Sequence, residues 1–386
     1  MGKKIVIIGS GIVGVCIAYY LTHHHKFDTT NTQLIIIEAV QPACAASGKA
    51  GGLLSSGAFP AQIAPLSFSL HHELAEKYNG VDAWGYRRIK AWSVEGCRGT
   101  KNPVKLPADL DWINAEYITH AEELGGTDMY AQVQPYLFTS FLLRKVLEFD
   151  SASLIVGKVT KILGERSETG ICASGVSYID TNGETRHLAA DHVVLANGPW
   201  VKSLISTCPV LAIKAHSITI QPPSQVSAYA LFTDLRLGRY RYVSPEIYAR
   251  KDEIFISGEG SPEHLPETAR EVVPEVEKCD TLFRDAGEIS RQIKDSKIIR
   301  KQACFLPVVD SRMCSGPFIG KTNVENLLAA VGHSCWGINN APVTGKLVAE
   351  ILLDGKATSA DISGLEPLDF FDSSLSIYLG GMSSPP

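Results

Sequence analysis

The sequence predicts an α/β protein in which a Rossmann-type dinucleotide-binding domain is interrupted by a second α+β domain with an antiparallel sheet. An apolar run at 5–8 leads into a glycine-rich turn and a helical segment, and a second apolar run follows at 34–37. Buried strands are also expected at 192–197 and 327–331. Between them, residues 213–258 alternate apolar and polar, as a half-buried antiparallel sheet does. The first domain is therefore expected to be discontinuous.

The turn after the first strand has the G-x-G-x-x-G pattern, Gly9-Ser10-Gly11-Ile12-Val13-Gly14. Gly9 permits the tight turn, Gly11 lets a pyrophosphate approach the backbone, and Gly14 lets the helix pack on the strand. The free N–H groups at the helix start then face the phosphates. Glu38, which ends the next strand, accepts hydrogen bonds from a ribose and favours a cofactor without a 2′-phosphate. Together these features predict a dinucleotide site; the alternative is a glycine-rich turn that binds nothing.

The composition is that of an ordinary globular protein, with 386 residues, 45% of them hydrophobic and 20% charged. Such a length suggests two domains. The net charge of −5 gives no reason to expect nucleic acid or an anionic membrane as a partner. The sequence contains no window of 18 apolar residues, so a membrane-spanning helix is not expected. The nine cysteines form no C-x-x-C pair, which indicates reduced thiols in the cytosol and no metal site. We expect His23-His24-His25 to be a solvated helix end.

The other elements follow in order along the chain. A loop of small residues at 45–53 suits close passage beside a flat ligand. Strands are expected at 154–156 and 159–162 and at 175–179, and the last of these is expected to pair across a turn at 180–183. Helical patterns occur at 66–79, at 262–296 and from about Pro342 to Leu353, where the proline would lie just inside the helix start.

Residues 332–345 read G-H-S-C-W-G-I-N-N-A-P-V-T-G and are similar to the glycine-oxidase pattern G-H-x-x-x-G-I-x-x-A-P-x-T-G. With the phosphate loop, this motif makes the chain resemble FAD-dependent oxidoreductases of the D-amino-acid oxidase and glycine oxidase class over nearly its whole length. The resemblance implies that the loop crosses the flavin ring and that the next helix points its N-terminus at the pyrimidine end. Within the family, the chain looks most similar to poorly characterised fungal oxidoreductases, some of them associated with endosomal recycling.

The resemblance implies FAD as the cofactor and assigns residues to it. The phosphate-loop and ribose positions are Gly9, Gly11, Ile12, Val13, Gly14, Glu38 and Ala39. The loop that lines the flavin supplies Ala46, Ser47, Gly51, Gly52 and Leu53, and Lys49 is a further candidate there. The adenine side and the second strand end supply Val159, Ala196, Asn197, Gly198 and Trp200. The loop that covers the flavin supplies Gly332, His333, Ser334, Cys335, Trp336, Gly337, Ile338 and Asn339.

The same resemblance suggests limits for the domains. The Rossmann-type FAD-binding domain would comprise 1–85, 140–212 and 300–372. The substrate domain would comprise 86–139 and 213–299. The last residues, 373–386, are rich in Ser, Gly and Pro and are expected to form a surface tail.

The chemistry that the family implies is oxidation of a C–N bond, with hydride transfer from the α-carbon to flavin N5. Catalytic roles in this chain are assigned to His333 and Trp336, which lie in the loop over the flavin. The family's usual carboxylate anchor is an arginine just before a proline, but Leu306 occupies that position here. A compensating cation would be Arg241, beside Tyr242, although a solvated pair of arginines with Arg239 is the plainer interpretation.

Two further departures concern the flavin itself. Cys304 lies near the position at which sarcosine-oxidase relatives attach flavin covalently, but the spacing differs by one residue and a plain buried cysteine is the simpler interpretation. Those relatives also carry a lysine that activates oxygen, and residues 253–258 contain none. Oxygen is therefore expected to be a poor electron acceptor.

The leading hypothesis is a flavoenzyme that oxidises an amine or an N-substituted amino acid. The alternatives are a flavin dehydrogenase with a non-oxygen acceptor, and an FAD-binding protein that acts in endosomal trafficking with little turnover. The expected partner is a small-molecule amine, with no nucleic acid and no transmembrane segment. The expected location is cytoplasmic, or peripheral at the late endosome. The sequence leaves open the substrate, the acceptor and the oligomeric state.

Overall fold

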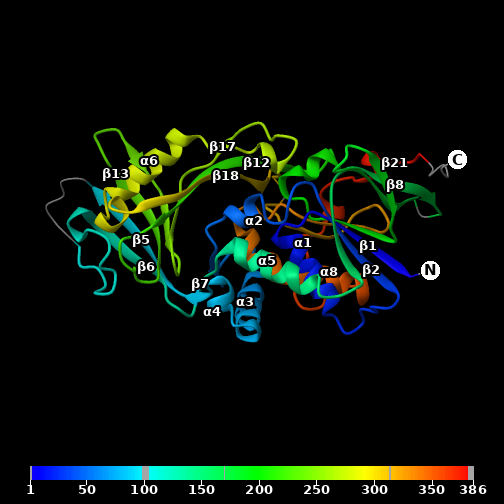
Figure 1. Ribbon diagram of the computed structural model, residues 1–386, viewed down its shortest axis with the longest axis horizontal. Helices are drawn as coiled ribbons and strands as arrows, with labels where there is room; N and C mark the ends of the chain where they lie inside the picture. The colour runs from blue at the N-terminus through cyan, green and yellow to red at the C-terminus, as the bar shows by residue number, and fades with distance from the viewer. Residues whose placement is uncertain (1, 98–103, 169, 313, 381–386) are drawn as a thin grey trace.

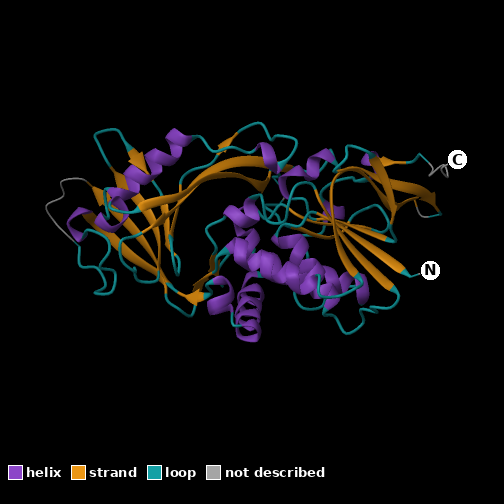
Figure 2. Ribbon diagram, viewed as in Figure 1, coloured by secondary structure: helices purple, strands orange, loops and turns teal. Residues whose placement is uncertain are grey.

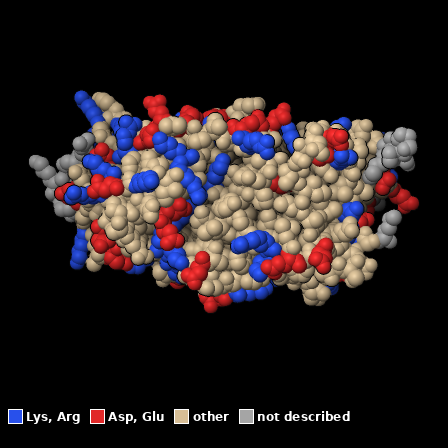
Figure 3. All heavy atoms as spheres, viewed as in Figure 1, with Lys and Arg blue, Asp and Glu red and all other residues tan. Residues whose placement is uncertain are grey.

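The computed structural model describes residues 2–97, 104–168, 170–312 and 314–380. Two large sheets lie at opposite ends of an elongated molecule, and most of the long helices pack beside the first sheet (Figures 1 and 2). On the face shown in Figure 3, acidic and basic side chains are interspersed around a largely uncharged centre. This face therefore presents no large field of one sign.

The first sheet has the strand order β10-β9-β8-β2-β1-β11-β20-β19. Its parallel strands are β1 (Lys3–Ile8), β2 (Thr32–Glu38), β8 (Ala152–Ser167), β11 (His192–Leu195) and β20 (Leu327–Val331). Antiparallel strands extend it at both edges, namely β9 (Gly170–Asp180), β10 (Thr185–Ala189) and β19 (Phe318–Lys321). Because both faces are covered, the inner residues of the central strands are apolar: Ile5 and Ile7 enter one core, and Val6 and Ile8 the other.

Four long helices pack against the first sheet or one another, namely α1 (Ile12–Thr22), α3 (Ala64–Tyr78), α5 (Pro135–Val146) and α8 (Gly337–Leu353). The crossing of α1 and α8 is so close that a Cβ at Gly345 would lie 2.5 Å from the backbone of Cys16. Short helices are α2 (Ala46–Lys49), α4 (Gly80–Trp84) and α7 (Arg291–Lys294). Within 262–296, α-helix is limited to α6 (Val276–Gly287) and α7, so the expected helical region was too long.

The start of α8 differs from the prediction, because the helix begins at Gly337 and Pro342 lies inside it. A proline there cannot donate to the carbonyl of Ile338, four residues earlier. The ring Nε2 of His71 lies 2.9 Å from that carbonyl oxygen and replaces the missing donor. A side chain from α3 thus allows the helix to continue through the proline, which the local sequence pattern does not show.

The second sheet has the order β17-β12-β16-β15-β13-β5-β6, with β18 paired to β12 and β14 to β13. Its strands are β5 (Lys90–Cys97), β6 (Ile118–Gly125), β12 (Val210–Gln221), β13 (Tyr229–Arg236), β14 (Tyr242–Val243), β15 (Glu246–Ala249), β16 (Ile254–Ser257), β17 (Ser261–Pro262) and β18 (Lys297–Val309). All pairs are antiparallel except β13 with β5. A small sheet of β3 (Leu53–Ser55), β7 (Tyr130–Gln132) and β4 (Arg87–Arg88) lies between the large ones. The predicted antiparallel second sheet is therefore present.

Three of the expected domain limits fall inside continuous elements. The limits at 212/213 and 299/300 divide β12 and β18, whose long pairing crosses from one end of the molecule toward the other (Figure 1). The limit at 139/140 divides α5, whose Phe138 and Leu142 belong to the core of the first sheet. The domain ranges remain a proposal, with these three limits in need of revision.

The expected surface tail is wrong for its first residues. Ser373 is fully buried, and β21 (Ile377–Tyr378) adds a parallel strand to β8. Ile377 packs into the core beneath Ile162, which explains why the chain returns to the sheet despite its polar composition. Residues 381–386 lie outside the described part of the chain.

Candidate functional site

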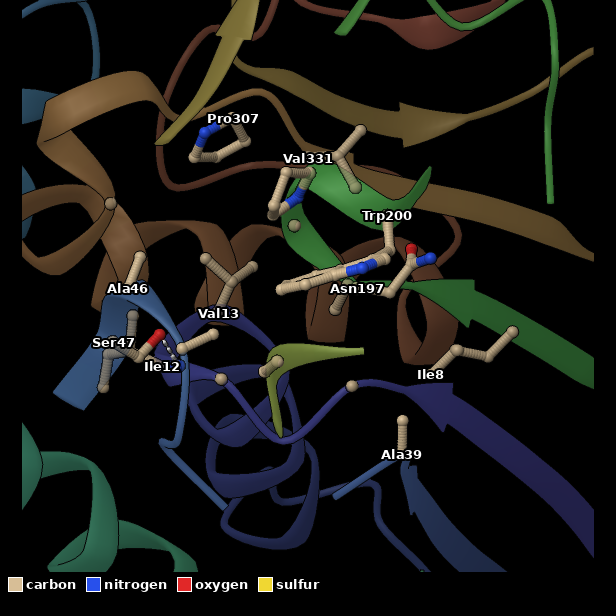
Figure 4. Close-up of a pocket in the computed structure, with 18 of the residues that line it drawn as sticks. Ile8, Ile12, Val13, Ala39, Ala46, Ser47, Asn197, Trp200, Pro307 and Val331 are labelled. Carbon is tan, nitrogen blue, oxygen red and sulfur yellow. Dashed lines mark hydrogen bonds between the residues drawn. The ribbon is translucent and has the colours of Figure 1, made fainter. Parts of the chain in front are cut away.

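A mainly apolar cavity lies at the carboxyl ends of the central parallel strands, where α/β sheets bind their ligands. It holds about 1260 Å³ of empty space, its open mouth included. In Figure 4, Ala46 and Ser47 lie on one side of the residues drawn as sticks, and Asn197 and Trp200 lie together on another side. Segments far apart in the sequence thus share one cavity.

The glycine-rich turn has the geometry that its pattern predicts. Gly9 has a φ of +104°, and a Cβ there would lie 2.6 Å from the carbonyl oxygen of Ala196. A Cβ at Gly14 would lie 2.1 Å from the carbonyl oxygen of Gly9, so the helix packs on the turn only without a side chain. Gly9 lines the cavity, whereas Gly14 lies behind its wall. The two glycines therefore shape the turn in different ways.

The N-terminus of α1 opens into the cavity at Gly11, Ile12 and Val13. The backbone N–H of Ile12 donates to Ser47 Oγ at 2.8 Å, the contact drawn as a dashed line in Figure 4. A Cβ at Gly11 would lie 3.0 Å from the same hydroxyl. At this point an N–H group of the helix N-terminus already has an oxygen atom as its partner. The start of α1 therefore suits an oxygen-rich group.

Glu38 lies at the end of β2 with its carboxylate held in place. Ser10 donates to Glu38 Oε2 from both its N–H and its Oγ, each at 2.9 Å, and the N–H of Val40 donates to Oε1 at 3.1 Å. Both Glu38 and Ala39 line the cavity. The fixed carboxylate is positioned to accept hydrogen bonds from a ribose.

The opposite wall comes from the end of β11 and from β8. Ala196, Asn197, Gly198 and Trp200 line it, together with Val159. The Oδ1 atom of Asn197 is buried and has no hydrogen-bond partner among the described residues. A buried acceptor without a donor is costly, so this atom, with the glycine cradle and Glu38, fits a polar ligand such as FAD.

The motif at 332–345 forms the turn between β20 and α8 and the first half of α8 itself. Gly332, His333, Ser334, Cys335, Gly337 and Ile338 line the cavity. Gly332 has a φ of +78°, which lets the chain turn sharply after the strand. The α8 N-terminus therefore faces the cavity and carries about half a positive charge, which favours a ligand that gains negative charge.

His333 is buried in the cavity wall, and its Nε2 lies 3.0 Å from Thr344 Oγ1. That hydroxyl donates to the carbonyl oxygen of Asn340 at 2.8 Å, so the imidazole Nε2–H is the donor to Thr344. Burial lowers the pKa of His333 to about 3. The ring is neutral near pH 7, which suits positioning or contact rather than proton transfer.

Several expected cofactor residues do not line the cavity, namely Gly14, Lys49, Gly51, Gly52, Leu53, Cys304, Trp336 and Asn339. Most have a structural reason to lie behind it. A Cβ at Gly51 would lie 2.4 Å from the ring of Tyr248, and one at Gly52 would lie 2.0 Å from the carbonyl oxygen of Val133. Lys49 Nζ donates to the carbonyl oxygen of Ala303 at 2.9 Å. Asn339 Oδ1 accepts from the N–H of Ser55 at 2.8 Å and fixes the start of α8.

Cys304 is buried on β18, and this burial raises the pKa of its thiol to about 11. A protonated thiol is a weak nucleophile. Its environment therefore favours an ordinary core cysteine over a covalent link to flavin.

The structure does not bring Arg241 and Tyr242 to the cavity. Arg241 Nη2 donates to Asp285 Oδ1 on α6 at 2.6 Å, and Tyr242 is 62% exposed on β14. Arg241 lies in the loop before β14, and only Tyr242 belongs to that short strand, so the expected alternation over two strand faces is not present. The plainer interpretation, a solvated pair of arginines with Arg239, fits Arg241 better than a role in the cavity, although Asp285 also pairs with it.

Residues 267–269 also line the cavity, although no motif in the sequence predicts it. They belong to a segment between β17 and α6 that we call the strap, residues 266–271. Trp200 Nε1 donates to the carbonyl oxygen of Pro266 at 2.8 Å, and Lys158 Nζ pairs with Glu267 Oε2 at 2.7 Å. Lys158 lies on β8 just after the part of that strand that pairs with β2. Its ion pair with Glu267 therefore joins the strap, and with it the second sheet, to the ribose and adenine side of the cavity.

Removing the ion pair between Lys158 and the strap should have a modest, salt-dependent effect on the retention of FAD. In Lys158→Ala, FAD should dissociate faster by about fivefold or less, since exposed ion pairs are weak. Stopped-flow release of FAD, followed by flavin fluorescence at low and high salt, measures this. The difference should shrink as salt rises, and the exposed Lys202→Ala variant is the control. Equal rates at low salt would mean that the strap does not hold the cofactor.

Among the described residues, His24, His25 and Asp354 could hold a metal ion. His24 Nε2 lies 3.1 Å from Asp354 Oδ2, and Lys26 Nζ lies 2.7 Å from Asp354 Oδ1. The Lys26 ammonium group already pairs with the carboxylate that a metal ion would need as a ligand. Sequence spacing did not reveal the aspartate, which comes from the end of α8.

No helix among the described residues is long and apolar enough to cross a membrane. A family model described as DAO, FAD dependent oxidoreductase, matches residues 4–351. The chain is 36% identical to "Putative oxidoreductase TDA3" of Saccharomyces cerevisiae, with 97% of this chain and 96% of that protein covered. It is 34% identical to "Putative oxidoreductase C1F5.03c" of Schizosaccharomyces pombe, with 95% and 98% covered. Glycine oxidase from Geobacillus kaustophilus has a similar fold, with a TM-score of 0.72, 19% identity and coverage of 94% and 98%.

Proposed function

Since the chain belongs to the DAO family of FAD-dependent oxidoreductases, we propose that it oxidises a C–N bond of an amine or an N-substituted amino acid. The protein is an FAD-dependent enzyme of the amino-acid oxidase or dehydrogenase type. The observation that carries the proposal is the single cavity that unites the glycine turn, Glu38 and the N-terminus of α8. Bound FAD supplies the acceptor for a hydride from the carbon beside the nitrogen.

In this proposal the chain's own residues bind and orient. The turn at Gly11 and the N-terminus of α1 hold the pyrophosphate, and Glu38 holds the ribose. The α8 N-terminus stabilises negative charge at the reacting end. The substrate nitrogen gives up its proton to solvent and the neighbouring carbon gives up a hydride, so that an imine forms. The imine takes up water and separates into a carbonyl compound and an amine. The two electrons then pass to an acceptor.

A second candidate is a dehydrogenase that delivers these electrons to a quinone or a protein. It is favoured because β16 and its flanking residues, 253–258, contain no lysine to activate oxygen. No observation on the described residues favours the endosomal alternative. A cytoplasmic location remains our proposal, and the oligomeric state stays open.

The test is anaerobic reduction of the FAD-loaded protein by a panel of amines and N-methyl amino acids. We expect the flavin absorbance to bleach with at least one compound and to return faster with an artificial dye than with oxygen. Acid precipitation of the same sample should leave the flavin in the supernatant, because the buried Cys304 thiol, with its raised pKa, is a weak nucleophile and is not expected to attach it. A flavin that stays oxidised with every compound would favour a protein that binds FAD without turnover.

A further inference from the structure

One part of the cavity wall is a short segment with very small side chains. We call residues 45–51, which read A-A-S-G-K-A-G, the flavin-side loop. Ala45, Ala46, Ser47 and Ala50 of this loop line the cavity. Small side chains bury little apolar surface, and a glycine backbone loses more conformational freedom on folding than any other. The loop therefore needs contacts from elsewhere to keep one position in the wall.

The second sheet supplies such contacts to the loop backbone. Gln302 on β18 donates Nε2 to the carbonyl oxygen of Lys49 at 2.9 Å. Arg250, which follows β15, donates Nε to the carbonyl oxygen of Gly51 at 2.9 Å. Its Nη2 donates to that oxygen at 2.8 Å and to the carbonyl oxygen of Ala50. Successive carbonyls of the loop are thus bound by side chains of the second sheet.

The guanidinium group of Arg250 is itself held in place. The side chain is buried, and Nη1 donates to Glu253 Oε1 at 2.6 Å. The guanidinium carbon lies 4.8 Å from the centroid of the Phe255 ring on β16, and the backbone N–H of Arg250 donates to the carbonyl oxygen of Glu253 at 2.8 Å. A planar fork fixed in this way transmits the position of the sheet to the loop, which a flexible ammonium group cannot do.

The other end of the loop reaches the glycine-rich turn. Ser47 Oγ accepts the N–H of Ile12 at 2.8 Å, at the start of α1 (Figure 4). The helix α2 lies between this contact and the carbonyls that Arg250 binds. A shift of the loop at Gly51 would therefore also move Ser47 against the helix N-terminus that faces the phosphate position.

We propose that Arg250 is a positioning residue for FAD, which fixes the flavin-side loop through the carbonyls of Ala50 and Gly51 so that the cavity keeps the shape that the cofactor needs. Gln302 adds one further bond at Lys49. Arg250 does not itself line the cavity, so it acts through the loop. This role concerns the binding of FAD and is independent of which amine is oxidised.

Arg250→Lys keeps the charge beside Glu253 and replaces the fork with a single ammonium group. FAD should bind about tenfold more weakly, because one ammonium cannot reach both carbonyls. Dilution of the FAD-loaded protein, followed by the fluorescence of released flavin, measures the dissociation constant. In the presence of excess FAD, backbone amides at 45–51 should exchange with deuterium at least about fivefold faster, as mass spectrometry of that peptide shows. Gln302→Met should weaken FAD binding by about threefold, since it removes one neutral hydrogen bond to the loop.

Arg87→Lys is the matched control and should leave both measurements unchanged. Arg87 on β4 also donates Nη2 to a carbonyl oxygen, that of Ala249, which Gln132 Nε2 binds as well. An arginine that served only the fold would lower the midpoint of urea unfolding in Arg250→Lys and leave FAD affinity and loop exchange as they were, which would overturn the assignment. Equal losses of FAD affinity in Arg87→Lys and Arg250→Lys would overturn it too. If circular dichroism shows Arg250→Lys to be unfolded, unchanged FAD binding in Gln302→Met decides against the loop contacts.

Discussion

Gly11→Val is expected to yield a folded protein that retains no FAD. A Cβ at Gly11 would already lie 3.0 Å from Ser47 Oγ, and the valine methyl groups extend further into the path of the pyrophosphate. The substitution would displace phosphate from the N–H groups at the start of α1 that follow Ile12, whose own N–H already donates to Ser47 Oγ. Losing two charge-assisted hydrogen bonds of about 1.5–3 kcal/mol each corresponds to a loss of affinity of more than about a hundredfold.

The measurement is the ratio of flavin to protein absorbance after purification, followed by titration with FAD. Gly238→Val is the matched control, because Gly238 is exposed on the second sheet and its Cβ would meet only Arg241, at 3.8 Å. Circular dichroism shows whether each variant is folded. A full complement of flavin in Gly11→Val would mean that the phosphates lie elsewhere.

The parts of the site that sequence reasoning located are those encoded by short contiguous patterns. The turn at 9–14, the acid at Glu38 and the motif at 332–345 each depend on neighbouring residues whose backbone geometry is local. The mixed α/β fold was predictable for a similar reason, since strands buried on both faces have a distinct apolar pattern. Most residues expected to touch FAD do line the cavity, and their contact with FAD remains a prediction.

What sequence reasoning missed depends on long-range contacts. The strap reaches the cavity through Pro266 and Glu267, in a segment with no motif of its own. The passage of α8 through Pro342 requires His71, nearly 270 residues earlier in the chain. None of these contacts produces a periodic pattern or a short motif in the sequence.

Leu306 lines the cavity at the position where the family is expected to carry an arginine that anchors a carboxylate. The substrate of this chain is therefore a proposal of its own. The family match carries the cofactor and the enzyme class, whereas the likeness to glycine oxidase, at 19% identity, supports the fold alone.

Acid should destabilise this protein steeply, because two buried histidines stay neutral in the fold. Burial lowers the pKa of His71 to about 4 and that of His333 to about 3. In the unfolded chain both titrate near the ordinary value of about 6.5. Their contribution to stability is present above that pH and is lost as the pH falls toward 4, since the unfolded state binds more protons. The expected slope for the two is about 2.7 kcal/mol per pH unit.

His71→Phe separates the titration from the hydrogen bond. At pH 7 the variant should be less stable by about 1–3 kcal/mol, because the carbonyl of Ile338 loses its donor while the ring volume beside Phe138 is kept. Its slope should fall by about 1.4 kcal/mol per pH unit, so the two stability curves should approach and cross near pH 5. Urea unfolding from pH 7.5 to 4.5 measures both curves, with exposed His187→Gln as the control. Parallel curves would mean that His71 accepts a proton in the folded protein, and the hydrogen bond that carries α8 past Pro342 would then come from an imidazolium.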